Sequence, residues 1–226
     1  MKKTLKIFLI ILISACMLVT FTGCGKKEDE DDVKETRRNR IESKEDVEEK
    51  SESKEFSMGE WENNVYTNDF LGIKYNLPSG WKYSSDEEIA KLMNVGKELL
   101  NDDQKNLGEI AELTSVYYVV ANDPNTGNNI VIMSEKPLME ASTDYYINSL
   151  KTQLENLDSI NYEIGETSKE TIGSRQYDTL TVSTSSNGVK LAQKYYIYKL
   201  DKYFVDIIVT STNGEANISN MMKSFE

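Results

Sequence analysis

Residues 189–211, VKLAQKYYIYKLDKYFVDIIVTS, contain the pattern that decides the fold. Two runs rich in β-branched and aromatic residues, 189–200 and 203–211, are separated only by Asp201 and Lys202. Apolar side chains alternate along the second run with the period of a β-strand: Val205, Ile207 and Val209. The stretch therefore predicts two antiparallel strands joined by a tight turn.

The pattern continues on both sides of this hairpin. Residues 177–184 are a third strand candidate, and Asn187-Gly188 is the tight-turn signal that joins it to the next run. Beyond the last strand, residues 215–225 carry apolar side chains at helical spacing: Ile218, Met221, Met222 and Phe225. The C-terminal part therefore predicts a three-stranded meander and a helix that packs on its face.

Further strand candidates lie closer to the N-terminus. Residues 116–121 and 130–134 are short apolar runs, and the Asn-rich and Asp-rich loop between them predicts a hairpin. Residues 65–66 and 73–77 are shorter candidates with turn residues between them. Residues 162–171 are weakly patterned and predict one or two edge strands.

Helical segments interrupt these strands. Ser85 and Glu88 form a capping box in front of an apolar helical stripe. Residues 107–113 suggest a shorter helix, and residues 142–157 have the spacing of an amphipathic one. Antiparallel runs interrupted by helices predict an α+β domain over residues 59–226, with an antiparallel sheet sandwiched by helices.

The first residues of the chain have the composition of a leader. Three lysines precede an apolar run, 7–21, which is shorter than a spanning helix of about 20 residues and typical of a signal sequence. Residues 21–24, FTGC, resemble the lipobox of bacterial lipoproteins. In that family the cysteine thiol is acylated by diacylglycerol and the leader is cut before it. The resemblance implies a signal peptide at 1–23 and a lipidated Cys24.

Residues 13–16, ISAC, are a rival match to the same motif. Cleavage before Cys16 would leave the apolar residues 17–21 at the new N-terminus, whereas the chain turns polar directly after Cys24. We therefore favour Cys24; an uncleaved anchor and a secretory signal without lipidation are the alternatives. The implied partner is the lipid bilayer, which acyl chains enter with about 0.8 kcal/mol per buried methylene.

Residues 24–58 are dominated by charged side chains and serine, with little apolar surface to bury. Such a segment predicts a disordered tether, and a flexible chain of this length spans about 30–35 Å. The expected location is the extracytoplasmic face of the cell membrane. A domain without cysteine mildly favours a Gram-positive envelope.

Charge and residue types exclude several functions. Beyond residue 58 the chain has 25 acidic and 14 basic side chains, a net charge of −11, which disfavours nucleic acid as a partner. The chain has no histidine, which excludes Ser-His-Asp catalysis and histidine-bound zinc. Asp123, Asn125 and Gly127 only loosely match the start of a calcium loop, so a plain turn is expected. We predict no enzyme activity, cofactor or metal.

Paired tyrosines are the candidate recognition residues: Tyr117, Tyr118, Tyr145, Tyr146, Tyr195, Tyr196 and Tyr198. Adjacent residues on a strand point to opposite faces, so one tyrosine of each strand pair could be exposed and recognise a protein or glycan. The alternative is that helices cover both faces and all of these tyrosines are structural. Trp61 and Trp81 are expected to pack.

Residues 70–81, FLGIKYNLPSGW, look like the opening element of PsbP-like α/β/α sandwich domains. The late meander and a terminal helix ending in residues 223–225, KSF, fit the same order, so the resemblance covers residues 61–226. Photosynthetic members of that family bind a membrane complex and tune metal ions. The resemblance implies a non-enzymatic binding or assembly module and assigns no ligand or site residue.

Together these patterns predict a membrane-anchored extracytoplasmic lipoprotein that acts as a binding or accessory module of the cell envelope. Its partner would be another envelope protein or a small ligand. The alternatives are a carboxylate-dependent enzyme acting on cell-wall glycan and a purely structural lipoprotein. A cleft with two converging acids, one with a raised pKa, would favour the enzyme.

Overall fold

The computed structural model describes residues 55–98, 114–137, 139–157, 160–186 and 188–226. Several predictions lie outside these ranges: the leader, Cys16, Cys24, the tether up to residue 54 and the helix at 107–113. Within the described ranges no helix is long and apolar enough to cross a bilayer.

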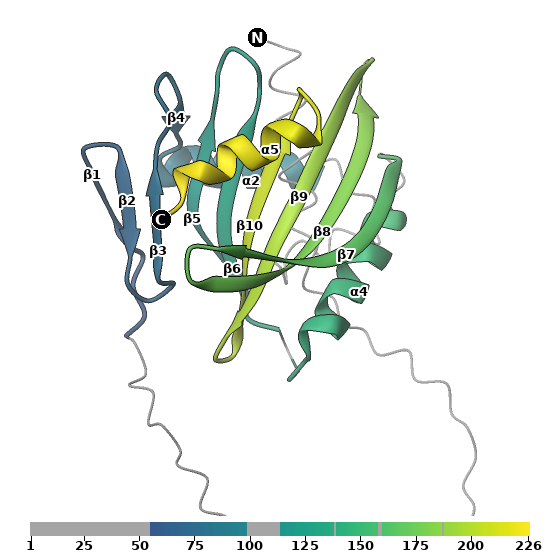
Figure 1. The fold of residues 1–226 in the computed structure, drawn as a ribbon, viewed down its shortest axis with the longest axis horizontal. Coiled ribbons are helices and arrows are strands. Elements are labelled where there is room, and N and C mark those ends of the chain that lie inside the picture. Colours follow the sequence, from purple (N-terminus) through teal and green to yellow (C-terminus); the bar gives the residue numbers. More distant parts are fainter. Residues whose placement is uncertain (1–54, 99–113, 138, 158–159, 187) are drawn as a thin grey trace, which may run out of the picture.

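Seven antiparallel strands form the main sheet, in the spatial order β4-β5-β6-β10-β9-β8-β7 (Figure 1). They are β4 (Lys82–Tyr83), β5 (Ser115–Asn122), β6 (Asn129–Glu135), β7 (Tyr162–Ile172), β8 (Arg175–Ser186), β9 (Val189–Leu200) and β10 (Tyr203–Ser211). The two strands predicted at 189–200 and 203–211 are confirmed with those bounds. The β5–β6 hairpin joins the C-terminal meander along β10. Residues 204–210 of β10 pair with β6 over the whole length of β6.

The sequence predicted one or two edge strands at 162–171, and the structure has a single edge strand there, β7, with a bulge. Its pairing with β8 shifts register between Ile164 and Thr167. Gly165 lies in the bulge, and a Cβ there would be 2.5 Å from the backbone oxygen of Thr181. The close approach of the two backbones explains why this position has no side chain.

A second sheet of three strands was not predicted as a separate unit. It contains β1 (Glu60–Glu62), β2 (Val65–Asn68) and β3 (Ile73–Asn76) in that order. β1 and β2 are joined by Asn63 and Asn64, both with positive φ, as a two-residue hairpin turn requires. The strand candidates at 65–66 and 73–77 belong to this sheet.

The main sheet is covered on both faces, as the α+β sandwich predicts. In Figure 1, α5 (Glu215–Met221) crosses in front of the sheet, whereas α2 (Asp86–Glu98) and α4 (Thr143–Glu155) lie behind it. α5 continues into a 3-10 turn, η1 (Met222–Ser224), so the predicted helix at 215–225 divides in two. The three-stranded sheet packs on the α5 face as well.

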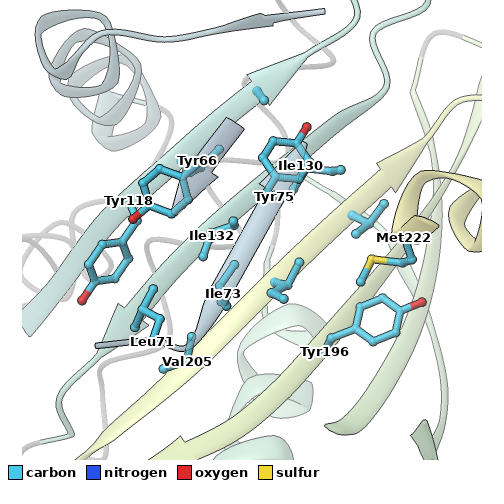
Figure 2. Close-up of a cluster of buried hydrophobic side chains, with 14 of the residues drawn as sticks. Tyr66, Leu71, Ile73, Tyr75, Tyr118, Ile130, Ile132, Tyr196, Val205 and Met222 are labelled. Atoms are coloured by element: carbon cyan, nitrogen blue, oxygen red, sulfur yellow. The ribbon is translucent and has the colours of Figure 1, made fainter. Parts of the chain in front are cut away.

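Each face has its own apolar core. The core behind the sheet combines side chains of α4 with Met133, Phe204 and Ile208 of the strands. The core in front joins the small sheet to the main one, and Figure 2 shows part of it. Its labelled members are Tyr66, Leu71, Ile73, Tyr75, Tyr118, Ile130, Ile132, Tyr196, Val205 and Met222.

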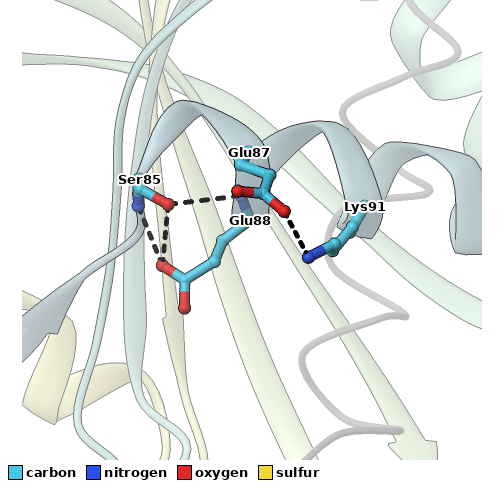
Figure 3. Close-up of polar contacts among 4 residues, drawn as sticks. All are labelled: Ser85, Glu87, Glu88 and Lys91. Carbon is cyan, nitrogen blue, oxygen red and sulfur yellow. Dashed lines mark hydrogen bonds and ion pairs between the residues drawn. The ribbon is translucent and has the colours of Figure 1, made fainter.

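The predicted capping box starts α2 (Figure 3). The backbone N–H of Ser85 donates to Glu88 Oε2 at 2.9 Å, and the backbone N–H of Glu88 lies 3.4 Å from Ser85 Oγ. Glu87 and Lys91 add an ion pair of 2.7 Å one turn apart. These contacts satisfy N–H groups at the start of the helix that have no partner inside it.

The residues that precede β1 lie against β2. Tyr66 Oη donates to the carbonyl oxygen of Met58 at 2.7 Å, and Asn68 Nδ2 donates to that of Ser57 at 2.9 Å. Gly59 has a φ of 72°, and a Cβ there would lie 2.5 Å from the Tyr66 hydroxyl oxygen. The final residues of the predicted tether are therefore fixed to the domain.

Candidate functional site

The paired tyrosines do not form the recognition surface that the sequence allowed. Tyr117, Tyr118, Tyr146, Tyr195, Tyr196 and Tyr198 are all at most 8% exposed, because both faces of the sheet are covered. Tyr145 alone among the seven is exposed, at 50%. Of the two possibilities that the sequence left open, the one in which all of these tyrosines are structural holds for the strands.

The two tryptophans pack, as expected. The ring of Trp61 stacks on Tyr83 with centroids 4.1 Å apart and also contacts Tyr66 and Tyr75. Trp81 is half-buried against the front core. Both residues connect the small sheet to its surroundings.

The loop that loosely resembled a calcium site is a turn. Asp123 Oδ1 accepts from the backbone N–H of Asn125 at 2.9 Å, and Oδ2 accepts from Thr126 Oγ1 at 2.7 Å. Desolvation opposes the effect, but the hydrogen bonds from Asn125 and Thr126 together hold the pKa of Asp123 below its usual value. Its oxygens organise the loop, as the plain-turn prediction requires.

An enclosed pair of carboxyl groups lies between the sheet and α4. Tyr146 Oη is 2.9 Å from Glu135 Oε2 and 2.8 Å from Asp206 Oδ2. Glu135 and Asp206 are each 0% exposed and Tyr146 is 1% exposed. The Tyr146 ring stacks on Phe204 with centroids 4.1 Å apart, which fixes its hydroxyl between the two acids. We call these three residues the carboxyl–phenol cluster.

Strand register brings the two acids together. β6 and β10 pair antiparallel with Glu135 opposite Phe204 and Met133 opposite Asp206. Residues two apart on a strand share a face, so Glu135 and Asp206 become diagonal neighbours on the α4 side. Tyr146 lies on the buried face of α4 and reaches both.

The environment favours the neutral forms of both acids. Burial, and then the charge of Asp206, raises the pKa of Glu135 well above its usual range. Burial raises the pKa of Asp206 to about 7, although the hydrogen bond from Tyr146 opposes that effect. In the described part of the chain no Lys or Arg forms an ion pair with either acid. Glu135 Oε1 and Asp206 Oδ1 are buried without a hydrogen-bond partner.

Two close acids with raised pKa values are what a carboxylate-dependent glycosidase needs, but these two are enclosed. Neither Glu135 nor Asp206 lines either of the two clefts described below. A polymeric substrate has no access to them in this conformation, so the pair does not supply the open cleft that the enzyme hypothesis requires.

A cleft of about 790 Å³ opens between the β7–β8–β9 strands and the start of α5. Its polar lining residues are Glu163, Thr181, Ser183, Lys190, Thr212 and Glu215. Ser183 Oγ donates to Glu163 Oε2 at 2.9 Å and Thr181 Oγ1 donates to Glu215 Oε1 at 3.4 Å, so both acids already have a protein partner. The volume of this cleft is in the range of pockets that hold small molecules.

A smaller polar cleft of about 420 Å³ separates α4 from β7 and β8. Asp144 and Asn148 line it from α4, and Lys169 and Asp178 line it from the strands. Lys169 Nζ and Asp178 Oδ1 form an ion pair of 2.7 Å, and this hydrogen bond raises the pKa of Lys169. Of the two carboxylates that line this cleft, Asp144 and Asp178, the second is therefore neutralised by Lys169.

Within the described ranges, no three residues among Asp, Glu, His and Cys are grouped closely enough to hold a metal ion. Cys24, the predicted lipidation site, lies outside those ranges. The sequence patterns missed the carboxyl–phenol cluster. A signal was present in Asp206, an acid inside the apolar run FVDIIV, but its partner followed only from the pairing of β6 with β10.

No family model and no curated protein matches this chain. Among solved structures it is similar to cyanobacterial PsbP from Synechocystis, with a TM-score of 0.47 and 8% identity, over 72% of this chain and 90% of that one. It is also similar to LpqN of Mycobacterium tuberculosis, involved in cell envelope biogenesis, with a TM-score of 0.38 and 14% identity, over 68% and 79%. At such low scores and identities, neither similarity assigns this chain to a family or gives it a function.

Proposed function

We propose that this chain is a lipid-anchored protein of the extracytoplasmic face of the cell membrane, attached through acylated Cys24. Its domain is a non-enzymatic binding or accessory module for another envelope protein or a small ligand. One observation carries the proposal: the tetrad at residues 21–24 ends a basic and apolar leader, and a charged spacer follows at once.

The folded part supports this organisation. Ser57 and Met58 are hydrogen-bonded to side chains of β2, so the spacer ends at a fixed point on the domain. A self-contained domain at the end of a charged spacer can meet partners at a distance from the bilayer, about 30 Å for a flexible chain of this length.

Binding rather than catalysis is the role that the residues favour. The chain has no histidine, and the two acids with raised pKa values are enclosed. Cleft-lining Asp178 is paired with Lys169. We therefore keep the glycan-cleaving enzyme only as the alternative.

Anchoring is tested by Cys24→Ser, with Cys16→Ser as the matched control. We expect Cys24→Ser to move the protein from the membrane fraction to the medium in its producing cell, because no acyl chain can be attached. Cys16→Ser should leave it in the membrane fraction. If Cys24→Ser stays membrane-bound while Cys16→Ser is released, Cys16 carries the lipid; if both stay bound, the leader is an uncleaved anchor.

Catalysis is tested by incubating the purified protein with cell-wall glycan and measuring new reducing ends. We expect no release above that of a heat-denatured sample. Release that is abolished by Asp178→Asn or Asp144→Asn would replace the binding module with the enzyme. Both residues line the smaller cleft, where a glycan can reach them.

A further inference from the structure

The carboxyl–phenol cluster contains fewer hydroxyl hydrogens than its contacts need. The Tyr146 hydroxyl has one hydrogen, yet its oxygen lies within 2.9 Å of both Glu135 and Asp206. A hydroxyl donates to one acceptor only, so the second short contact needs a proton on one of the acids, which then donates to the Tyr146 oxygen. The observed geometry therefore requires at least one protonated carboxyl group.

We propose that the carboxyl–phenol cluster is a proton-dependent contact that holds α4 on the sheet, so that α4 detaches more readily as the pH rises. The inference concerns the folded domain alone, goes beyond the proposed function, and does not depend on Cys24.

Helix α4 is the element that this contact controls. Glu135 and Asp206 belong to strands in the middle of the sheet, whereas Tyr146 belongs to α4. When both acids are ionised, two buried anions share one phenol hydrogen, and each also has an oxygen without a partner. Such groups are costly to bury, and movement of α4 would admit water to both of them.

Other titratable groups on this face do not neutralise the pair. Within the described residues, those on the strands are Tyr117 of β5, Tyr162 and Lys169 of β7, Asp178 of β8, and Tyr195 and Lys199 of β9. Lys199 Nζ donates to the carbonyl oxygen of Ala141 at 2.9 Å, and Asp178 accepts from Lys169 of β7. The charged residues at the start of α2, Asp86, Glu87, Glu88 and Lys91, are exposed. The proton is therefore the species that balances the acids.

The direction of the pH effect follows from the two states. In the docked state burial raises the pKa of Asp206 to about 7 and that of Glu135 well above its usual range, whereas solvent contact returns both to their ordinary acidic values. The docked state then binds more protons than the detached one. Docking is therefore most favourable at acidic pH and weakens as the pH rises towards and through about 7.

Detachment of α4 would also change the smaller cleft. Asp144, Ile147 and Asn148 line one side of it, and all three belong to α4. The proton-dependent contact therefore couples the pH outside the domain to the shape of this cleft.

Hydrogen–deuterium exchange of the full-length protein in detergent, read by mass spectrometry over residues 143–155, tests the proposal. After correction for intrinsic exchange rates, we expect protection of α4 to fall by about 10- to 100-fold between about pH 5 and about pH 8, since one pKa unit corresponds to tenfold. Asp206→Asn keeps the shape but cannot ionise, so it should lose most of this dependence. Asp178→Asn, an acid on the same face that is paired with Lys169, should keep it.

Equal protection of α4 at the two pH values in the wild-type protein would overturn the proposal. So would an Asp206→Asn variant with the full wild-type dependence. Infrared spectroscopy provides a test that needs no Asn variant to fold: at about pH 7 the exposed acids are ionised, so a remaining carboxylic-acid carbonyl band reports the cluster. We expect that band in the wild-type protein and a weaker one in Glu135→Gln; its absence from the wild type would also overturn the proposal.

Discussion

Asp206 is an acid in surroundings that disfavour its ionised form. It lies in the middle of β10 between apolar neighbours, and its carboxyl group is completely enclosed. A carboxylate in such a place needs a partner of opposite charge or a proton. The described residues offer it the Tyr146 phenol and no cation, so burial raises its pKa and favours the protonated form.

Asp206→Asn should change how the stability of the whole domain depends on pH. Because burial raises the folded pKa of Asp206 to about 7 from an ordinary acidic value, the wild-type free energy of unfolding should fall as the pH rises across that interval. We expect a loss of roughly 2–3 kcal/mol between about pH 5 and about pH 8. The variant should lose much less in urea titrations followed by circular dichroism.

Asp144→Asn is the control for this measurement, because it removes an exposed acid from α4. Its stability should follow the wild-type pH profile. A profile for Asp206→Asn as steep as that of the wild type would contradict the assignment of the raised pKa.

Gly165→Ala should destabilise the domain without touching its core. The new Cβ would lie 2.5 Å from the backbone oxygen of Thr181, so β7 and β8 must separate at the bulge. We expect the free energy of unfolding to fall by about 1–3 kcal/mol in denaturant titration. Glu166→Ala, at the exposed neighbouring position, should change it by less than about 0.5 kcal/mol; equal effects would contradict the steric explanation.

Among the elements, those with a strong period and clear turn signals were predictable. The strands at 189–200 and 203–211 and the helix at 142–157 agree with β9, β10 and α4 to within two residues. The β-branched and aromatic runs of the two strands and the helical apolar spacing of α4 are properties of the local sequence, so they could be used directly. Two-residue β4 is defined only by its pairing with β5, a contact that local sequence does not encode.

The candidate sites show the same division between local and long-range information. Cys24 could be proposed as the lipidation site because four adjacent residues carry the motif. Glu135 and Asp206 are 71 positions apart in the numbering and meet only through the pairing of β6 with β10. The tyrosine pairs left two possibilities open, since alternation along a strand does not tell whether one face or both are covered.

Ser85→Ala should weaken the start of α2. The Ser85 side chain and that of Glu88 form reciprocal contacts at the first turn, so removal of the hydroxyl leaves a helix N–H without its partner. We expect a loss of about 1 kcal/mol in the free energy of unfolding. Ser84→Ala, one residue earlier, makes a matched control because Ser84 donates its backbone N–H to the carbonyl oxygen of Val120, a contact that the substitution keeps. Similar losses in both variants would contradict the capping role.

At the scale of the whole molecule, two sheets of different size share one core. The small sheet contacts the main sheet through aromatic side chains, and residues 225–226 pair with β3 as well. Trp61 contacts Tyr83 of β4 in the main sheet and Tyr75 of β3 in the small one. The small sheet is therefore a cover for the front core and not an appendage.

Trp61→Ala should therefore loosen the small sheet from the main one. Loss of the stacked and edge contacts of this partly buried ring should lower the free energy of unfolding by about 2–3 kcal/mol. Hydrogen exchange should rise in β1–β3 before it rises in the meander. Tyr83→Ala removes a ring that is 45% exposed and should have a smaller effect; a uniform rise across both sheets would contradict the expectation.

The pairing of β6 with β10 also has a consequence for the order of folding. The meander from β7 to β10 joins strands that follow one another along the chain, whereas β6 must wait for a strand that begins at Tyr203. During synthesis, which starts at the N-terminus, the β6 edge of the β5–β6 hairpin stays unpaired until β10 has been made. The sheet can therefore be completed only after most of the chain has been synthesised. This late step closes a long loop between β6 and β10.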